Sequence, residues 1–427
     1  MAVGRDLPDD LIADILRRLP PRSLAVSRCA CRSWRGLVDA RWLLRADLLP
    51  RSVGGIFLNY CTLYSPEFLS RPTSAGPSIS GDLEFVPGIS QVVDHCEGLL
   101  LIRETQDDYV ANPATRRWAR LPPCPASWPG HTFFEIKCLV YEPTMSPHYQ
   151  VFLIPSLPDP EVVNPETMAQ AQQPKWPPSS YSLQVFSSIT GCWEERSFVL
   201  EGGHWEERLA SVRDGGRVLD KIYWREAIYV LCQIGFVLRL SMSNAKYRLV
   251  PRPSEAECEH HGGFCLGRSE KGVYCAFEHD WHGLRIFHLN ESGGQLGWEL
   301  KHAVDLRSFA RKLHAREDYN RQHKGPWILQ DINYYKYPYG NDKHREAVED
   351  NFEWNSDDDD VLNTEDMVEG FYAGYITFLG FHPYKEIAFL ELDLTRAVAY
   401  HWGTSSFRTW ETYIQKITLK LLAVRQR

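Results

Sequence analysis

Apolar residues in the first fifty positions recur at the spacing of an α-helix. Leu11, Ile12, Ile15, Leu16 and Leu19 form one stripe at a period near 3.6 residues. Acidic residues lie at the start of this stripe and arginines near its end, so the charges favour the helix dipole. The pattern predicts a helix that ends at a pair of prolines, of which the second is suited to begin the next helix.

Further apolar positions up to about residue 49 predict two more short helices. These positions are Leu24, Cys31, Trp34, Leu37 and Val38. A module of roughly 45 residues buries too little apolar surface to be confidently stable alone. We therefore expect residues 1–49 to form an all-α module that packs on its own chain or docks to a partner.

From about residue 85 the apolar residues occur in short runs, rich in β-branched and aromatic side chains and separated by turn residues. Such runs predict an antiparallel all-β domain over residues 85–415. Residues 50–84 are rich in Pro, Gly and Ser and predict a linker, with Gly55–Tyr60 as a candidate first strand. Residues 416–427 are basic and unlike a closing strand, so we expect a C-terminal tail. The main predicted strands are Gly98–Ile102, Ile136–Tyr141, Tyr149–Ile154, Tyr181–Phe186, Ala227–Cys232, Phe236–Leu240, Gly272–Phe277, Leu284–Leu289, Tyr375–Phe381 and Ile387–Leu392.

A loose repeat within the all-β domain combines a polar turn with a Trp that enters the next strand. A hairpin repeated in this way around an axis is typical of a β-propeller, because a closed ring leaves few sheet edges open. Without an acidic insert, the domain has room for about six blades of roughly 40–50 residues. The repeats are Asn112–Trp118, Ser188–Trp193, Asn290–Trp298 and Gly403–Trp410.

The predicted fold class is therefore α+β multidomain, with three short N-terminal helices followed by an all-β propeller of about six blades. The alternative is a pair of β-sandwiches with Trp in ordinary core positions, since the spacing of the repeats is irregular. One segment stands apart from either fold: eleven acidic residues and no Lys or Arg lie between residues 346 and 369. This charge density predicts a disordered, solvated insert at about 340–370, with a docking surface for a basic partner as the alternative.

The composition limits the class of protein. The chain has 427 residues, of which 44% are hydrophobic and 12% aromatic, enough for a large core. Its formal net charge of −8 gives no electrostatic reason to expect a nucleic-acid partner. The first ten residues do not resemble a signal peptide, and no apolar run reaches the roughly 18 residues of a membrane-spanning helix. We expect a soluble protein of the cytoplasm or nucleus that binds no membrane.

The cysteines and histidines offer few candidates for chemistry. Eleven cysteines are scattered without a CxxC pair, which indicates reduced thiols and excludes a RING or zinc-ribbon arrangement. One cluster, Cys258-x-His260-His261-x-x-x-Cys265, holds four potential ligands, but its spacing matches no structural zinc pattern. No motif for a nucleophile elbow, a phosphate-binding loop or a metalloprotease helix occurs. We expect no catalytic residues, no metal and no cofactor.

The N-terminal module resembles an F-box. The residues Leu7-Pro8-Asp9-Asp10-Leu11, Ile15-Leu16, Leu19-Pro20, Leu24, Cys31 and Trp34 stand in the order and spacing of that family. By resemblance, the module binds a Skp-type adaptor and, through it, the cullin of an SCF ubiquitin ligase. The positions that match the adaptor-binding residues of the family are Leu7, Pro8, Ile12, Ile15, Leu16, Leu19, Pro20, Leu24, Cys31 and Trp34.

Segments of the all-β domain are similar to the F-box-associated (FBA-type) β-propeller domain of plant F-box proteins. They read CEGLLL, VANPATRRWARLP, YSLQVFSSITGCWEERSF, GRSEKGVYCAF and FLGFHPYKEIAFL. The two resemblances together imply a substrate receptor, which binds the adaptor through the F-box and a target protein through the β domain for ubiquitination. Alternatives are an F-box scaffold that acts outside a ligase and a propeller enzyme. The target and the residues that bind it are not predicted.

Overall fold

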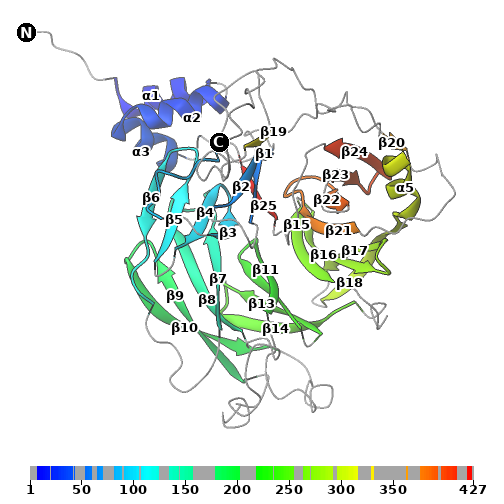
Figure 1. The fold of residues 1–427 in the computed structure, drawn as a ribbon. Helices are drawn as coiled ribbons and strands as arrows, with labels where there is room; N and C mark the ends of the chain where they lie inside the picture. Colours follow the sequence, from blue (N-terminus) through cyan, green and yellow to red (C-terminus); the bar gives the residue numbers. More distant parts are fainter. Residues whose placement is uncertain are drawn as a thin grey trace, which may run out of the picture.

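The structure is a computed structural model that shows three helices beside a ring of β-sheets (Figure 1). None of the helices that it describes is long and apolar enough to cross a membrane. The described residues are 7–43 without 20 and 42, 53–59, 65–70, 81–88, 91–124 without 105 and 106, 134–156 without 144, 178–201, 218–253 without 234, 263–315 without 270 and 292–295, 328–330, 362–363, 376–410 without 393–395, and 421–425.

Three short helices form the N-terminal module, as the apolar pattern predicts. They are α1 (Asp9–Arg17), α2 (Pro21–Ala30) and α3 (Arg32–Ala40). In α1, Asp9 and Asp10 lie in the first turn and Arg17 in the last, so these charges stabilise the helix dipole. The helices share one small core, which consists of Ala13, Leu16, Leu24, Val38 and Leu43.

Residues 91–251 form three antiparallel units of four strands, named here blades 2, 3 and 4. Blade 2 consists of β3 (Gln91–Cys96), β4 (Leu99–Arg103), β5 (Asp108–Asn112) and β6 (Arg117–Arg120). Blade 3 consists of β7 (Phe134–Tyr141), β8 (Tyr149–Ser156), β9 (Ser180–Ser187) and β10 (Cys192–Leu200). Blade 4 consists of β11 (Val218–Trp224), β12 (Ala227–Cys232), β13 (Phe236–Ser241) and β14 (Lys246–Pro251). A short parallel pairing of β10 with β14 joins blades 3 and 4 into one sheet of eight strands.

Blades 5 and 6 follow the same order of antiparallel strands. Blade 5 consists of β15 (Phe264–Ser269), β16 (Gly272–His279), β17 (Gly283–Asn290) and β18 (Gly297–Asp305). Helix α5 (Arg307–Ala315) comes next, and Phe309 and Ala310 pack it against the core between blades 5 and 6. Blade 6 consists of β21 (Ile376–Phe381), β22 (Ile387–Leu392), β23 (Arg396–His401) and β24 (Ser406–Trp410), with β20 (Leu362–Asn363) added at its edge.

Blade 1 joins the two ends of the all-β domain. β1 (Val53–Leu58) pairs on one side with β2 (Glu67–Ser70) and on the other with β25 (Leu421–Arg425), and β19 (Ile328–Gln330) extends β2. Gly55 in β1 is needed for packing, because a Cβ atom there would lie 2.0 Å from the ring of Phe68.

The structure of blade 1 differs from two expectations. Residues 50–84 contribute two strands to the ring rather than a linker alone, and the expected tail at 416–427 contains a strand. β1 overlaps the candidate first strand Gly55–Tyr60. β2 and β25 are short, and they pair with β19 and β1, which lie far away in the sequence, so their local composition gives little sign of them. Of the acidic insert expected at about 340–370, only residues 362–363 are described, and a disordered state for it stays a prediction.

Contacts between first strands close the ring. Neighbouring blades meet through β25 and β3, β3 and β7, β7 and β11, β11 and β15, β15 and β21, and finally β21 and β25. These contacts return to their starting strand, so β25 and the first strands of the other blades surround a common axis. The fold is a six-bladed β-propeller preceded by a helical module, which confirms the predicted fold class.

Most of the core lies between adjacent blades, which explains why many strands are apolar on both faces. In β12, Ile228 and Val230 belong to a core shared with blade 3. Tyr229 and Leu231, on the other face, belong to a core shared with blade 5. A strand with two buried faces reads as a continuous apolar run rather than an alternating one.

The predicted turn-plus-Trp repeats lie in the hairpins between third and fourth strands. Trp118, Trp193 and Trp298 are each the second residue of a fourth strand. In blade 4 the second residue of the fourth strand is Tyr247, so the Trp pattern did not identify that blade. In blade 6 the place belongs to Phe407, because Trp410 ends its strand rather than beginning it.

Candidate functional site

Helix α1 carries two apolar stripes, and only one of them packs into the helical module. Leu11 and Ile15 are one helical turn apart on α1 and are 51 and 54% exposed. Leu7, which precedes the helix, is 54% exposed. The adjacent stripe includes Ala13 and Leu16, which are 0 and 1% exposed. Large apolar side chains gathered on one exposed face are typical of an interaction surface. Leu7, Leu11 and Ile15 therefore form a candidate α1 docking face.

The ten residues predicted to bind an adaptor fall into two groups in the structure. The exposed group is Leu7, Pro8, Ile15, Cys31 and Trp34. The group in or against the module core is Ile12, Leu16, Leu19 and Leu24. Pro20 lies outside the described residues. Leu16 and Leu24, which are 1 and 2% exposed, hold the helices together. Adaptor binding stays a prediction for the ten positions.

Leu11 belongs to the docking face, although sequence reasoning gave it no adaptor-binding role. It is four residues before Ile15 on the same helix, and this spacing is the signal that could have identified it. The sequence pattern joined Leu11 and Leu16 in one stripe. The structure separates them because the apolar arc of α1 is wider than the part that α2 and α3 cover.

Polar contacts fix the three helices that present the docking face. Arg28 of α2 binds Asp39 of α3 through two contacts, Nε to Oδ1 at 2.6 Å and Nη2 to Oδ2 at 3.0 Å. Arg41, after α3, contacts Asp10 of α1 at 2.5 Å. At the start of α3 the sulfur of Cys31 accepts a backbone N–H at 3.4 Å. The Arg28–Asp39 pair is bidentate, which fixes its geometry more closely than a single contact does.

Charged side chains from several blades meet inside the propeller ring. Glu97, in the turn after β3, accepts a hydrogen bond from Arg268 of β15, with Nη2 and Oε1 2.7 Å apart. Blades 2 and 5 are three places apart in a ring of six, so this pair spans the interior. Lys221 of β11 also reaches blade 2, where its Nζ lies 3.2 Å from Oδ1 of Asp94. The four side chains are between 3 and 15% exposed.

Neighbouring groups complete this interior network. Arg268 donates to the carbonyl of Tyr223 at 3.3 Å, and the Tyr384 hydroxyl lies 3.4 Å from the second oxygen of Glu97. Burial lowers the pKa of His95 to about 4, so its imidazole is neutral at physiological pH. The two ion pairs join strands of blades 2, 4 and 5, so the network braces the ring. Sequence reasoning missed it because Glu97 and Arg268 are 171 residues apart.

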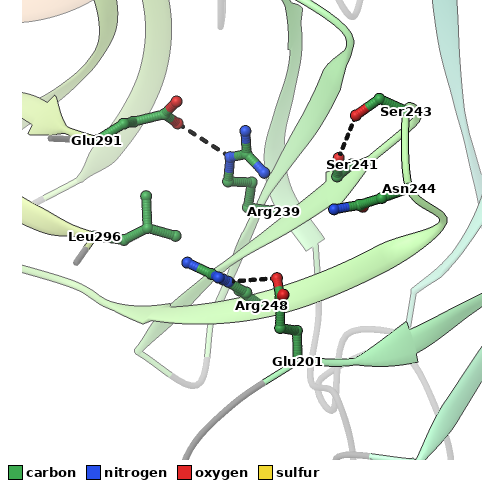
Figure 2. A pocket seen from close by; sticks show the side chains of 8 residues that line it. All are labelled: Glu201, Arg239, Ser241, Ser243, Asn244, Arg248, Glu291 and Leu296. Carbon is green, nitrogen blue, oxygen red and sulfur yellow. Dashed lines mark hydrogen bonds and ion pairs between the residues drawn. The ribbon is translucent and has the colours of Figure 1, made fainter. Parts of the chain in front are cut away.

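A recess of about 270 Å³ opens beside the turn between β13 and β14 (Figure 2). Arg239 and Arg248 lie directly opposite each other on these strands. Each binds a carboxylate from a neighbouring blade: Arg239 Nε lies 3.1 Å from Glu291 Oε1, and Arg248 Nε lies 2.7 Å from Glu201 Oε2. Two like charges at this register repel each other unless acids compensate them. The lining residues are Glu201, Arg239, Ser241, Ser243, Asn244, Arg248, Glu291 and Leu296.

The cysteine and histidine cluster of the sequence is only partly described. Cys258, His260 and His261 lie outside the described residues, and Cys265 on β15 is half-buried. Among the residues that the structure does describe, no three His, Cys, Asp or Glu side chains are placed to hold a metal ion.

Comparison with known proteins relates the helical module to a family. Residues 5–45 match the F-box domain family. An Arabidopsis thaliana protein named as an F-box/kelch-repeat protein is 22% identical over 339 residues, which are 72% of this chain and 75% of that protein. Two further F-box proteins of Arabidopsis match shorter stretches. One is 34% identical over 24% of this chain and 29% of its own length. The other is 29% identical over 24% of this chain and 30% of its own length.

Solved structures resemble the fold only distantly. YCF48 from Cyanidioschyzon merolae has a TM-score of 0.37 at 9% identity, over 85% of this chain and 86% of that one. A periplasmic gluconolactonase from Pseudomonas aeruginosa, PpgL, has a TM-score of 0.34 at 11% identity, over 88% of this chain and 100% of that one. The blades described above rest on the strand pairing of this chain.

Proposed function

We propose that this chain, which carries an F-box domain at residues 5–45, is the substrate-recognition subunit of an SCF-type ubiquitin ligase. The F-box binds a Skp-type adaptor and, through it, a cullin. The propeller, an FBA-type domain, holds the target protein. The subunit has no catalytic residues and acts in the cytoplasm or nucleus. Its contribution to ubiquitin transfer is proximity, because a target held in one complex with the ubiquitin donor reacts at a high effective concentration.

The α1 docking face is the observation that carries this proposal. Leu7, Leu11 and Ile15 lie within the segment that matches the F-box family, and more than half of each side chain is exposed. Burying apolar surface of this kind contributes roughly 25 cal/mol per Å². A partner that covers the face therefore gains free energy that the isolated module lacks.

The proposal is tested with the double variant Leu11→Ser, Ile15→Ser in the full chain. Truncating an apolar residue that anchors an interface costs about 1 kcal/mol or more, so we expect the loss of two to raise the Kd for a purified Skp-type adaptor by at least about 30-fold. Both side chains are exposed, so the melting temperature and the circular dichroism should stay unchanged. Biolayer interferometry with the immobilised adaptor measures the affinity.

Two control variants separate docking from folding. Arg17→Ser changes an exposed side chain on another side of α1 and should leave the Kd unchanged. Leu16→Ala removes a core side chain and should destabilise the module by about 2–5 kcal/mol, so its loss of binding would report unfolding. Full affinity of the Leu11→Ser, Ile15→Ser variant would refute the docking face. Affinity purification under proteasome inhibition, with mass spectrometry, then identifies the target.

A further inference from the structure

One arginine of the propeller is half-buried and has no acid beside it among the described residues. Arg252 follows β14, and its backbone N–H donates to the carbonyl of Gly235, in the turn between β12 and β13, at 2.9 Å. Its guanidinium lies over the ring of Phe264 on β15, with Cζ 4.5 Å from the ring centroid. The side chain therefore spans the boundary between blades 4 and 5.

The ring under the guanidinium belongs to a stack that reaches into the core. Phe264 stacks on Phe277, with ring centroids 4.5 Å apart and an angle of 27° between the planes. Phe277 stacks in turn on His279, with centroids 5.8 Å apart and an angle of 22°. Phe277 is 2% exposed and packs in the core shared by blades 4 and 5. The guanidinium thus rests on a fixed surface, and a group positioned in advance loses little entropy when it binds a partner.

Arg252 differs from the other arginines that are described over aromatic rings. Arg116 and Arg225 are exposed, so water solvates their charge. Arg196 and Arg239 each donate a hydrogen bond to a side-chain oxygen of another residue. Arg252 is half-buried, yet within the described ranges its guanidinium donates no hydrogen bond and makes no ion pair. A guanidinium carries five N–H donors in its own plane, and stacking on a ring leaves them unused.

The charge of Arg252 lacks a counter-ion among the described residues. Burial lowers the pKa of its guanidinium, and the other groups that act on it are the thiols of Cys275 and Cys232. Burial raises the pKa of both thiols, that of Cys232 to about 12, so both are neutral at physiological pH. An arginine stays protonated in spite of such a shift. An anion that reaches this guanidinium would therefore gain a charge-assisted contact that the described residues do not supply.

Gly235 keeps space beside two of the unused donors. A Cβ atom at this position would lie 3.6 Å from Nη2 and 3.7 Å from Nε of Arg252. The φ angle of Gly235 is +93°, a conformation that favours glycine, so the turn itself keeps a side chain away from these nitrogens. Two parallel N–H donors of one guanidinium are the arrangement that binds a carboxylate through both of its oxygens.

We propose that Arg252 binds a carboxylate side chain of the ubiquitination target; the inference rests on the proposed function of the chain as a substrate receptor. A carboxylate is planar and carries one charge, so it matches a single guanidinium in shape and in charge. Phosphorylated segments are recognised by clusters of arginines, whereas the groups that act on Arg252 include no second cation. The competing explanation is that the stem of Arg252 only covers the ring of Phe264.

The test uses the full chain and pools of synthetic nonapeptides, since the target sequence is unknown. The central residue is glutamate in one pool and glutamine in the other. The flanking positions carry random uncharged residues and both ends are blocked, so the pools differ in one carboxylate. We expect the glutamate pool to bind about tenfold more strongly, as for a hydrogen bond between charged groups. Arg252→Met should reduce this ratio to about one, and Arg252→Lys to about threefold, because lysine lacks the planar fork.

A matched control and a stability measurement separate binding from packing. Arg225 lies over the ring of Trp224 at the same distance of 4.5 Å but is exposed, so Arg225→Met should leave the tenfold ratio unchanged. Arg252→Met keeps an apolar stem over Phe264 and removes a half-buried charge, so its melting temperature should not fall.

Three results would overturn the proposal. The first is equal binding of the glutamate and glutamine pools by the wild type, and the second is an unchanged ratio in Arg252→Met. The third is a lower melting temperature of Arg252→Met with an equal loss of binding for both pools, which would indicate a packing role. A pool with central phosphoserine that binds more strongly than glutamate would overturn the choice of a carboxylate. The adaptor affinity of Arg252→Met should equal that of the wild type, so the ligase role and the carboxylate contact can fail separately.

Discussion

Glu97 and Arg268 make an ion pair of 2.7 Å across the interior of the ring, although they belong to blades on opposite sides of it. Their side chains are 12 and 15% exposed, so water screens the pair only weakly. The contact ties blade 2 directly to blade 5 without passing through the blades between them. The ring is therefore stabilised by contacts between neighbouring blades and also by an ion pair across its interior.

Breaking the Glu97–Arg268 ion pair should destabilise the propeller strongly. Arg268→Met leaves a buried carboxylate without its cation, and we expect a loss of about 3 kcal/mol or more in the free energy of unfolding by urea. The double variant Arg268→Met, Glu97→Met should recover much of that loss because no charge stays buried. Lys271→Met provides the control, since Lys271 pairs with Glu386 on the surface and is 65% exposed. Equally small losses in the free energy of unfolding for Arg268→Met and Lys271→Met would show that the interior ion pair does not stabilise the ring.

The tryptophans of the repeated hairpins should differ in their contribution to stability. Trp193 donates its indole N–H to the carbonyl of Pro122 at 3.0 Å and lies 5.6 Å from the ring of Phe186. Trp118 is 43% exposed and makes one edge contact with Tyr109. We expect Trp193→Ala to cost about 3 kcal/mol in urea unfolding and Trp118→Ala about 1 kcal/mol. A larger loss for Trp118→Ala would contradict this order.

A buried glutamate makes stability depend on pH. Glu391 on β22 is 2% exposed, and burial raises its pKa from 4.5 to about 7. Because the folded pKa lies above the unfolded one, the contribution of Glu391 to stability is fully present below pH 4.5 and is lost as the pH rises through 7. Glu391→Gln should therefore be more stable than the wild type at pH 8, by on the order of 1–3 kcal/mol, with a gap that narrows toward pH 5.

Thermal unfolding between pH 5 and pH 8.5 measures this difference. Glu194→Gln, an exposed residue on β10, should follow the wild-type profile. A gap between Glu391→Gln and the wild type that stays constant over this range would show that Glu391 does not titrate there.

Local patterns in the sequence were sufficient to predict the helices, most of the strands and the propeller. The turn-plus-Trp repeats worked because three blades have Trp as the second residue of their fourth strand, and they missed blade 4 because Tyr247 fills that place. β1 and β25 were not predicted as partners. Their pairing joins residues more than 350 positions apart, and no local periodicity records such a contact.

The candidate sites show where sequence reasoning stops. A helical stripe predicted α1, yet the stripe could not show that Leu16 faces the core while Leu11 faces outward. Helical periodicity gives the direction of a side chain, and exposure depends on what the neighbouring helices cover. The recess was not predicted at all, because Glu201, Arg239 and Glu291 come from three blades and meet only in the folded ring.

The pairing of β1 with β25 also means that the ring can close only late in biosynthesis. A ribosome that adds roughly 5–20 residues per second needs about 20–70 seconds to travel from Val53 to Leu421. Throughout that interval β1 exposes an open edge, which is a template for aggregation. The helical module, by contrast, leaves the ribosome before the propeller, and its core consists of its own residues. A premature stop codon late in the gene would therefore yield chains that display the α1 docking face beside an unfinished ring, occupying adaptor without delivering a target.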